Sequence, residues 1–309
     1  YNINIVLTGS LGNIGKSLTP QLVQKGHTVT VISSQAERRK AIEALGAKAA
    51  IGSMFDAGFL SATFKNADIV YLMETLDAAG DFFDQDADFI AAINRIGNNY
   101  KQAVEQSGVK HVLHLSSIGA HMNKGNGILI FHHHVEHILN QLSADVAIKF
   151  IRPVGFYTNM FSFIPAIKNK GAIISNYGGD KKEPWVSPLD IAAAIAEEME
   201  IGGQPGNRTI RYIASDEVSP NKMAEALGGA IGQPDLKWQV IPDEALLNNW
   251  LAAGFNAQIA RGFVEMQAAQ GTGILYEDYY RHKPALGKVK LKDFAREFAN
   301  AYNASSEQE

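Results

Sequence analysis

Three glycines at positions 9, 12 and 15 constrain the fold of this chain more than any other feature of its sequence. They follow an apolar run, Ile3–Thr8, that is typical of a strand, and they precede a helical pattern over Ile14–Lys25. A strand, a turn with glycines at this spacing and a helix form the phosphate-binding turn of a dinucleotide-binding fold. We therefore predict that one turn binds the pyrophosphate of a nicotinamide dinucleotide. Its residues are Gly9, Ser10, Leu11, Gly12, Asn13, Ile14 and Gly15.

Each glycine of this turn has a predicted role. A Cβ atom at Gly9 or Gly12 would obstruct the tight turn and the approach of a pyrophosphate. Gly15 is expected to let the helix pack closely on the strand. The helix that begins near Asn13 directs free N–H groups and its positive end toward the phosphates. The alternative, a glycine-rich turn without a ligand, is disfavoured by the strand before it and the helix after it.

Apolar runs and helical patterns alternate through the first half of the chain. Further strands are predicted over Thr28–Ser33, Ala47–Ile51, Ile69–Met73, His111–Ser116 and Ala147–Ile151, and helices over Gln35–Leu45, Asp84–Ser107 and Ile130–Leu142. Strands this apolar, separated by helices, indicate a parallel sheet covered on both faces. Right-handed crossovers place all carboxyl ends of such strands at one edge, where ligands bind. We predict an α/β fold with a doubly wound parallel Rossmann-type sheet, in an NAD(P)-binding domain over residues 1–153.

The pattern changes after Arg152-Pro153. Helical stretches are predicted over Pro188–Met199, Ser219–Ile231, Asp243–Leu251 and Ala257–Gln270, with short strands over Arg208–Ala214 and Trp238–Ile241. We predict a smaller mixed α/β lobe over residues 154–309 that shapes the substrate cleft. This lobe packs on the first domain and is partly interleaved with it, through a late strand that returns to the main sheet. The polar end, Ala304–Glu309, is expected to fray.

Composition excludes several classes of function. The 28 basic and 32 acidic residues are well mixed, which disfavours a nucleic-acid-binding surface. The chain has no cysteine, so it has no disulfide, thiolate metal site or cysteine nucleophile. No apolar run approaches the roughly 20 residues needed to cross a bilayer, and the first residues are typical of a strand rather than of a signal peptide. We expect a soluble cytoplasmic protein, a monomer or homodimer, that binds a small molecule and neither nucleic acid nor membrane.

The end of the second predicted strand bears on which dinucleotide binds. Sites that prefer NAD usually have an acidic residue about 20 residues beyond the glycines. Here the strand ends in Ser33-Ser34, and Arg38 follows with two further cations, Arg39 and Lys40. Small hydroxyls beside cations suit a 2′-phosphate, so NADP(H) is the preferred cofactor. NAD(H) stays possible, because the three cations are also consistent with the solvated face of a helix.

Four segments spread over most of the chain share the pattern of a known family. They are Thr8–Gly15, Leu115–Ser117, Arg152–Asn159 and Val186–Ala192. Together they resemble the NmrA-like group of atypical short-chain dehydrogenases/reductases. That group includes NAD(P)H-dependent quinone and triphenylmethane reductases, plant isoflavone-type reductases, and redox-sensing regulators that bind the dinucleotide without turning it over.

The resemblance implies further cofactor contacts at both ends of the dinucleotide. Around the adenosine ribose, its phosphate and the adenine it implies Ser33, Ser34, Arg38, Gly52 and Ser53, although many relatives have Asp at the position of Ser53. Around the inner ribose and the nicotinamide it implies Leu72, Met73, Ser116, Pro153, Val154, Gly155 and Phe156.

The usual acid of the superfamily is not present in this chain. Ordinary members pair a serine with a Tyr-x-x-x-Lys motif, whose tyrosine transfers the proton of the substrate oxygen. Where that motif is expected, this chain has a histidine-rich segment, and His133 and His137 occupy the positions of the pair. His133 is a candidate general acid. Three alternatives are a polar contact to the cofactor, a metal site and no chemistry at all. The metal ligands would be His133 with His137 or His132 with Glu136, but two ligands at one helical spacing fall short of a zinc site.

Tyr157 is the second candidate acid, because its hydroxyl follows the last strand of the first domain. The alternative for Tyr157 is an aromatic ring that packs under the second lobe. Glu74 and Asp77, after the fourth strand, are expected to be solvated loop residues.

Hydride transfer asks little of side chains, because the cofactor supplies the hydride. We therefore expect an NAD(P)H-dependent oxidoreductase that reduces a small, planar or quinone-like acceptor. The first alternative is a catalytically weak NADP(H)-sensing regulatory protein that binds a protein partner. A third interpretation is a sugar-nucleotide or carbonyl enzyme with a displaced acid, against which the missing Tyr/Lys pair weighs.

Overall fold

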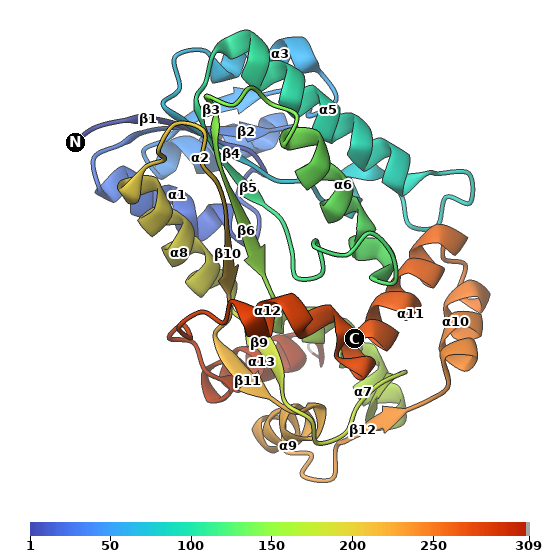
Figure 1. Ribbon diagram of the computed structural model, residues 1–309. Helices are drawn as coiled ribbons and strands as arrows, with labels where there is room; N and C mark the ends of the chain where they lie inside the picture. The colour runs from blue at the N-terminus through green and yellow to red at the C-terminus, as the bar shows by residue number, and fades with distance from the viewer. Residues whose placement is uncertain (307–309) are drawn as a thin grey trace.

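The strands predicted in the first half of the chain lie side by side in one central sheet of the computed structural model, which describes residues 1–306 (Figure 1). The seven strands of this sheet are β1 (Asn4–Leu7), β2 (Thr28–Ser33), β3 (Lys48–Ile51), β4 (Ile69–Leu72), β5 (His111–Leu115), β6 (Ala147–Pro153) and β10 (Arg208–Ile213). Their order is β10-β6-β5-β4-β1-β2-β3, and all neighbours pair in parallel. The predicted parallel Rossmann-type sheet is confirmed.

Helices cover both faces of this sheet, because successive residues of each strand point to opposite sides. On one face, Leu7 packs in a core with the apolar residues of α1 (Gly15–Gln24) and α8 (Pro188–Ile201). On the other face, Val6 packs with α3 (Ala57–Phe64), α5 (Phe89–Ser107) and α6 (Ile130–Leu139). The double winding leaves the carboxyl edge of the sheet open to a ligand.

The late strand expected from the second half of the chain is present. β10 pairs in parallel with β6, so that Tyr212 stands beside Arg152. Together with α8, this strand completes layers of the first domain with residues from beyond position 153. The division into residues 1–153 and 154–309 therefore stays a prediction.

A smaller lobe lies at the end toward which the β6 arrow points (Figure 1). It contains a three-stranded sheet of β7 (Gly155–Phe156), β9 (Glu183–Val186) and β11 (Asp216–Val218), and a pair formed by β8 (Ala172–Ser175) and β12 (Lys237–Val240). Its helices are α7 (Ile164–Lys170), α9 (Pro220–Ala230), α10 (Asp243–Ala252), α11 (Ala257–Thr272), α12 (Glu277–Arg281) and α13 (Leu291–Ser306). This lobe has an apolar core of its own, which includes Ile173, Trp185 and Phe294. The predicted smaller mixed α/β lobe is confirmed.

Several element boundaries differ from the predicted ones. α5 begins at Phe89 rather than near Asp84, because the Asp88 carboxylate caps the helix by accepting from the Ala91 N–H at 3.0 Å. Five α-helices of the described part have no counterpart among the predicted ones: α3, α4 (Leu76–Ala79), α7, α12 and α13. Residues 304–306, expected to fray, belong to α13, whose buried Phe298 anchors it; residues 307–309 lie outside the described part. Within residues 1–306, no helix is long and apolar enough to cross a membrane.

Candidate functional site

The predicted phosphate-binding turn connects β1 to α1 with two residues in left-handed conformations. Gly9 has a φ angle of 90° and Ser10 one of 56°. A left-handed serine costs on the order of 1–3 kcal/mol and persists only where the surrounding structure enforces it. Here the Ser10 N–H donates to the Ile32 carbonyl at 3.0 Å, which ties the turn to the end of β2. Strain of this kind collects at ligand-binding turns.

The atoms that a Cβ atom at each of these glycines would meet differ from the predicted ones. A Cβ atom at Gly15 would collide with the Ser10 carbonyl oxygen, so Gly15 serves the turn itself. The prediction that Gly15 is needed for packing of the helix on the strand is therefore wrong. A Cβ atom at Gly9 would come within 2.7 Å of the Met73 sulfur, and one at Gly12 within 3.3 Å of the Gly9 carbonyl oxygen. Gly9 is thus favoured by its left-handed backbone and Gly15 by the close Ser10 carbonyl oxygen, whereas a side chain at Gly12 would meet only a tight contact.

A hollow of about 220 Å³ lies beside this turn at the end of β2. It joins the turn to the residues expected around the adenosine phosphate, with Gln35 in addition. The lining residues are Gly9, Ser10, Leu11, Gly12, Ser33, Ser34, Gln35 and Arg38. Asn13 and Ile14 follow directly at the start of α1, and no residue in the described part accepts a hydrogen bond from their N–H groups. Free N–H groups at a helix N-terminus suit a phosphate.

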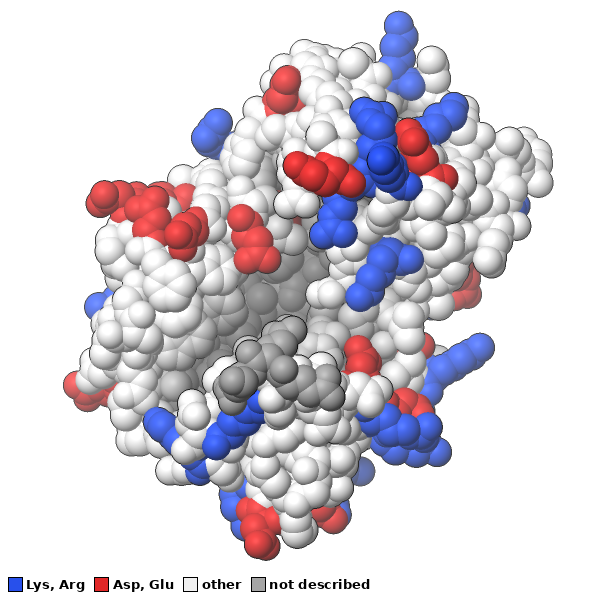
Figure 2. Space-filling view, turned by 180° about the vertical axis from the view of Figure 1, so that it is seen from behind, with Lys and Arg blue, Asp and Glu red and all other residues white. Residues whose placement is uncertain are grey.

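The polar groups of the hollow match an anion rather than a cation. The Ser10 hydroxyl donates to the Ser33 hydroxyl oxygen at 3.0 Å, and the Gln35 N–H donates to that same oxygen at 3.3 Å. Arg38 is exposed, and its Nε donates to the Gln35 side-chain oxygen at 3.4 Å. α2 (Arg39–Ala44) follows Arg38 directly, and Figure 2 shows Lys and Arg side chains gathered on the upper part of one face of the molecule, with Asp and Glu side chains beside them. The eight lining residues include this guanidinium and no carboxylate.

The other residues expected near the adenosine and the inner ribose lie next to the hollow but outside its lining. Gly52 donates its N–H to the Ser33 carbonyl at 3.0 Å, and the Ser53 hydroxyl accepts from the Phe55 N–H at 3.0 Å. Leu72 is fully buried. Met73 is half-buried over Gly9, and its carbonyl accepts from the Tyr100 hydroxyl at 2.6 Å.

The residues expected at the nicotinamide stand where β5 and β6 end. Ser116 follows β5 and is only 2% exposed, and its N–H donates to the Ile151 carbonyl of β6 at 2.7 Å. Pro153 and Val154 are buried, whereas Gly155 and Phe156 are half-buried. This end of the predicted cofactor site is more covered than the hollow at β2.

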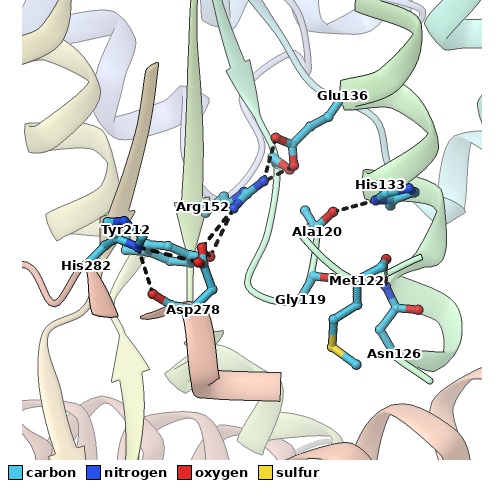
Figure 3. Close-up of polar contacts among 11 residues, drawn as sticks. Gly119, Ala120, Met122, Asn126, His133, Glu136, Arg152, Tyr212, Asp278 and His282 are labelled. Atoms are coloured by element: carbon cyan, nitrogen blue, oxygen red, sulfur yellow. Dashed lines mark hydrogen bonds and ion pairs between the residues drawn. The ribbon is translucent and has the colours of Figure 1, made fainter. Parts of the chain in front are cut away.

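A buried chain of polar contacts leads from Ser116 into the second half of the molecule, and Figure 3 shows its part from Glu136 through Arg152 to Tyr212 and Asp278. The Ser116 hydroxyl donates to Glu136 Oε2 at 2.8 Å. Arg152 donates to both oxygens of this carboxylate, from Nη2 at 3.0 Å and from Nε at 3.2 Å. Arg152 Nη1 then donates to the Tyr212 hydroxyl oxygen at 3.0 Å and to Asp278 Oδ2 at 3.3 Å. Residues of β5, α6, β6, β10 and α12 thus meet at one place.

His133 lies one turn before Glu136 on α6 and faces the segment after β5 (Figure 3). Its Nδ1 is 2.8 Å from the Ala120 carbonyl oxygen. Because a carbonyl can only accept, Nδ1 carries the hydrogen and Nε2 is the nitrogen left for other partners. The ring is half-buried. Burial lowers the pKa of the neighbouring His132 to about 3, so that ring is neutral, and His137 is exposed.

Tyr157 lies in the core of the smaller lobe. It is 1% exposed and its ring stacks on Phe294, with 4.9 Å between the ring centroids. Its hydroxyl donates to the Val289 carbonyl at 3.4 Å, and burial raises its pKa above the usual range. This placement agrees with the alternative that the Tyr157 ring packs under the second lobe, so we do not assign a catalytic role to Tyr157.

The model of the NmrA-like family matches residues 2–294. The chain belongs to the NmrA-like family. The expected resemblance is thereby confirmed over nearly the whole chain.

Individual relatives of this NmrA-like chain include reductases and a regulator. A (4-alkanoyl-5-oxo-2,5-dihydrofuran-3-yl)methyl phosphate reductase of Streptomyces griseus is 23% identical over 269 residues, which are 87% of this chain and 88% of the relative. The NADPH complex of an NADPH-dependent quinone oxidoreductase of Escherichia coli has a TM-score of 0.77 at 17% identity, over 95% of this chain and 99% of that one. NmrA, a negative transcriptional regulator, has a TM-score of 0.69 at 18% identity, over 99% and 98%. At these identities the structures show a common fold.

Two buried contacts of acidic side chains in this NmrA-like chain are absent from the sequence-based predictions. Glu74, expected to be solvated, is buried and accepts from His114 Nε2, which lies 2.8 and 3.0 Å from its two oxygens. That expectation is wrong, because β4 and β5 are neighbours and His114 reaches the residue after β4. Glu136 and Arg152 form the second contact. The signal for it was available, since Glu136 adjoins the apolar stripe of α6 and a buried carboxylate needs a partner.

In the described part of the chain, no three His, Asp or Glu side chains converge as a group that could hold a metal ion. Glu136, which stands one turn from His132, is instead bound by Ser116 and Arg152.

Proposed function

We propose that this NmrA-like protein is an NADPH-dependent reductase of a small conjugated acceptor of the quinone class. One observation carries the proposal. The hollow beside the Gly9–Gly15 turn is lined by hydroxyls and one guanidinium, without a carboxylate, and α1 begins three residues after the last turn residue of its lining. The reductase relatives support this interpretation, and one of them forms a complex with NADPH.

The hollow favours NADP(H) over NAD(H). Ser34, Gln35 and Arg38 are exposed in its lining, and Ser33 is buried and accepts a hydrogen bond from the Gln35 N–H. A guanidinium and hydroxyls bind a phosphate well, because charge-assisted hydrogen bonds are stronger than neutral ones. An acidic residue that would accept from two ribose hydroxyls is missing from the lining. We therefore assign the adenosine 2′-phosphate to this hollow.

When bound, NADPH supplies the hydride. The acceptor also gains a proton, and we assign this proton to His133 Nε2. The hydrogen bond from Nδ1 to Ala120 keeps the ring oriented, and Nε2 carries a transferable proton when the imidazole is charged. A quinone becomes a hydroquinone by taking one hydride and one proton, so the proton from His133 completes the reaction, and solvent returns a proton to His133 afterwards.

The first experiment measures NADPH binding and then NADPH oxidation. We expect Arg38→Ala to weaken NADPH binding about tenfold and to leave NADH binding unchanged, because one charge-assisted contact to the phosphate is lost. Arg39→Ala is the matched control, since Arg39 is exposed and lies 3.8 Å from Glu43. An equal loss for both cofactors would contradict the assignment of the 2′-phosphate.

Turnover is tested separately with a panel of quinones, dyes and enones. We expect the purified protein to oxidise NADPH with at least one of them. Binding of NADPH without oxidation faster than in buffer would contradict a reductase. A pull-down with and without NADP(H) would then test a regulatory role, for which a cofactor-dependent protein partner is required.

A further inference from the structure

We propose that Glu136 is a positioning residue that makes Ser116 a hydrogen-bond acceptor for the carboxamide N–H of the nicotinamide ring. This inference rests on the proposed function, because it needs the dinucleotide to bind. The observation behind it is the hydrogen bond of 2.8 Å from the Ser116 hydroxyl to Glu136 Oε2, between two buried side chains.

The direction of this hydrogen bond follows from the partners of Glu136. A hydroxyl has one hydrogen and two lone pairs, whereas an ionised carboxylate only accepts. Arg152 donates to both oxygens of Glu136, at 3.0 and 3.2 Å, which holds the carboxylate in its ionised form. Ser116 must therefore give its one hydrogen to Glu136. Its lone pairs are the part of the hydroxyl that stays free for another group.

Arg152 is itself fixed from the opposite side. Its Nη1 donates to Tyr212 and to Asp278, and the Tyr212 hydroxyl donates to Asp278 Oδ2 at 2.6 Å (Figure 3). Burial opposes the charged form of Arg152, but Glu136 and Tyr212 together outweigh it, and the pKa of Arg152 is raised. A guanidinium with partners on both sides has little freedom to turn. The Glu136 carboxylate, and with it the Ser116 hydroxyl, is consequently held in one orientation.

The order of the strands places Ser116 at the nicotinamide. The sheet runs β2-β1-β4-β5-β6, and the hollow for the adenosine phosphate lies at β1 and β2. A dinucleotide that crosses the carboxyl edge from this hollow has its other end at β5 and β6. Ser116 is the first residue after β5. The carboxamide on the nicotinamide ring has an NH₂ group and a carbonyl oxygen, and a serine that has already donated its hydrogen pairs only with the NH₂ group.

This assignment also restricts the chemistry of the acceptor. A Ser116 hydroxyl bound to Glu136 has no hydrogen for a substrate carbonyl oxygen. Protonation of the acceptor then falls to His133 or to solvent, which suits a conjugated acceptor better than a simple ketone.

The test compares the binding of NADP⁺ with that of its 3-acetylpyridine analogue by calorimetry. The analogue keeps the carbonyl oxygen and replaces the NH₂ group by a methyl group. We expect the wild type to bind NADP⁺ about threefold to tenfold more tightly than the analogue, because only NADP⁺ forms the hydrogen bond to Ser116 and one neutral hydrogen bond changes the affinity by about this factor. In Ser116→Ala this preference should fall to about one.

Glu136→Gln separates positioning from a merely structural role. The side-chain amide that this substitution introduces can donate to Ser116, which releases the serine hydrogen, so the preference should fall toward one or reverse. A structural role would weaken both ligands equally and leave the ratio unchanged. Glu198→Gln is the matched control. Glu198 is a buried carboxylate on α8 that accepts a hydrogen bond from Arg211 at 2.8 Å, and the ratio of the two affinities in this variant should equal that of the wild type.

The outcomes distinguish the two proposals. If the wild type does not bind NADP⁺ at all, the proposed function fails. If it binds NADP⁺ and the analogue equally, or if Ser116→Ala keeps the preference, the inference about Glu136 and Ser116 fails alone. If Glu136→Gln does not fold, as judged by circular dichroism, Ser116→Ala still decides the role of Ser116 as an acceptor. The contribution of Glu136 is then decided with Glu136→Asp, whose shorter carboxylate should lower the ratio.

Discussion

The hydroxyl of Ser10 and the hydroxyl of Ser33 are joined by a hydrogen bond of 3.0 Å that ties the phosphate-binding turn to the end of β2. It connects a residue in a left-handed conformation to one that is almost fully buried. The turn and the strand end therefore form one unit, and the hollow for the adenosine phosphate lies over it.

Substitution of Ser10 should separate the hydrogen bond from the backbone strain. Ser10→Ala and Ser10→Gly both lose the bond to Ser33, but only glycine adopts a φ angle of 56° without strain. We expect Ser10→Gly to be more stable than Ser10→Ala by about 1 kcal/mol in urea unfolding. Equal stability of the two variants would show that position 10 is not strained.

Gly15→Ala should disrupt the turn, because its Cβ atom would collide with the Ser10 carbonyl oxygen. We expect a lower midpoint of thermal unfolding and at least tenfold weaker NADPH binding, since a shift of the turn displaces the N–H groups at the start of α1. Gly229→Ala is the control, since no atom lies within 4 Å of its added Cβ on the exposed face of α9. That variant should be unchanged or up to about 1 kcal/mol more stable.

His133→Asn tests the proton donor. The asparagine amide can keep the hydrogen bond to the Ala120 carbonyl, while the titratable Nε2 is lost. We expect kcat for a quinone to fall about a hundredfold with little change in NADPH affinity, as for the loss of a general acid. An unchanged kcat would mean that solvent supplies the proton. His137→Asn, at an exposed position of the same helix, should leave kcat unchanged.

Glu183 should make the stability of the smaller lobe depend on pH. Burial raises the pKa of Glu183 to about 7 from its usual 4.5, although the hydroxyls of Tyr177 and Tyr276 donate to it at 2.8 and 2.9 Å. Between pH 4.5 and 7 the folded protein therefore holds a proton that the unfolded chain releases, and stability falls as pH rises through this window.

The expected decline is on the order of 3 kcal/mol, at about 1.4 kcal/mol for each pKa unit. Glu183→Gln has no proton to lose there, so urea unfolding at several pH values should show a flatter profile than in the wild type. Glu225→Gln, a substitution on the exposed face of α9, should keep the wild-type profile. A wild-type stability that rises from pH 5 to 7 to the same extent in Glu183→Gln would contradict this role.

The local parts of the fold could be predicted because their causes lie within a few residues of one another. The Gly9–Gly15 spacing, the apolar strands and the Ser33-Ser34 strand end depend on backbone conformation and on hydrophobic periodicity along the chain. The predicted residues of the first part of the turn, Gly9 to Gly12, and of the strand end, Ser33 and Ser34, line one hollow in the structure, and Asn13 to Gly15 follow next to it.

Contacts between distant parts of the chain could not be predicted in this way. The sequence predicts that Tyr157 presents its hydroxyl at a strand end. In the structure its ring packs against Phe294, 137 positions later in the chain, and lies in the core of the smaller lobe. The sequence predicts that Glu74 is a solvated loop residue, but in the structure His114 of β5 lies within hydrogen-bond distance of it. In both cases the partner is chosen by how the strands and helices pack, which the neighbouring residues do not specify.

By itself, the sequence determined that this chain forms a parallel dinucleotide-binding sheet with a glycine turn at one strand end. Spacing and polarity are sufficient for this, because turns and strands form through local sterics and burial. Only the tertiary structure decided which side chains surround the reacting end. Ser116, Glu136, Arg152 and Asp278 come from four separate segments, and a buried charge is stable only where folding supplies its partner.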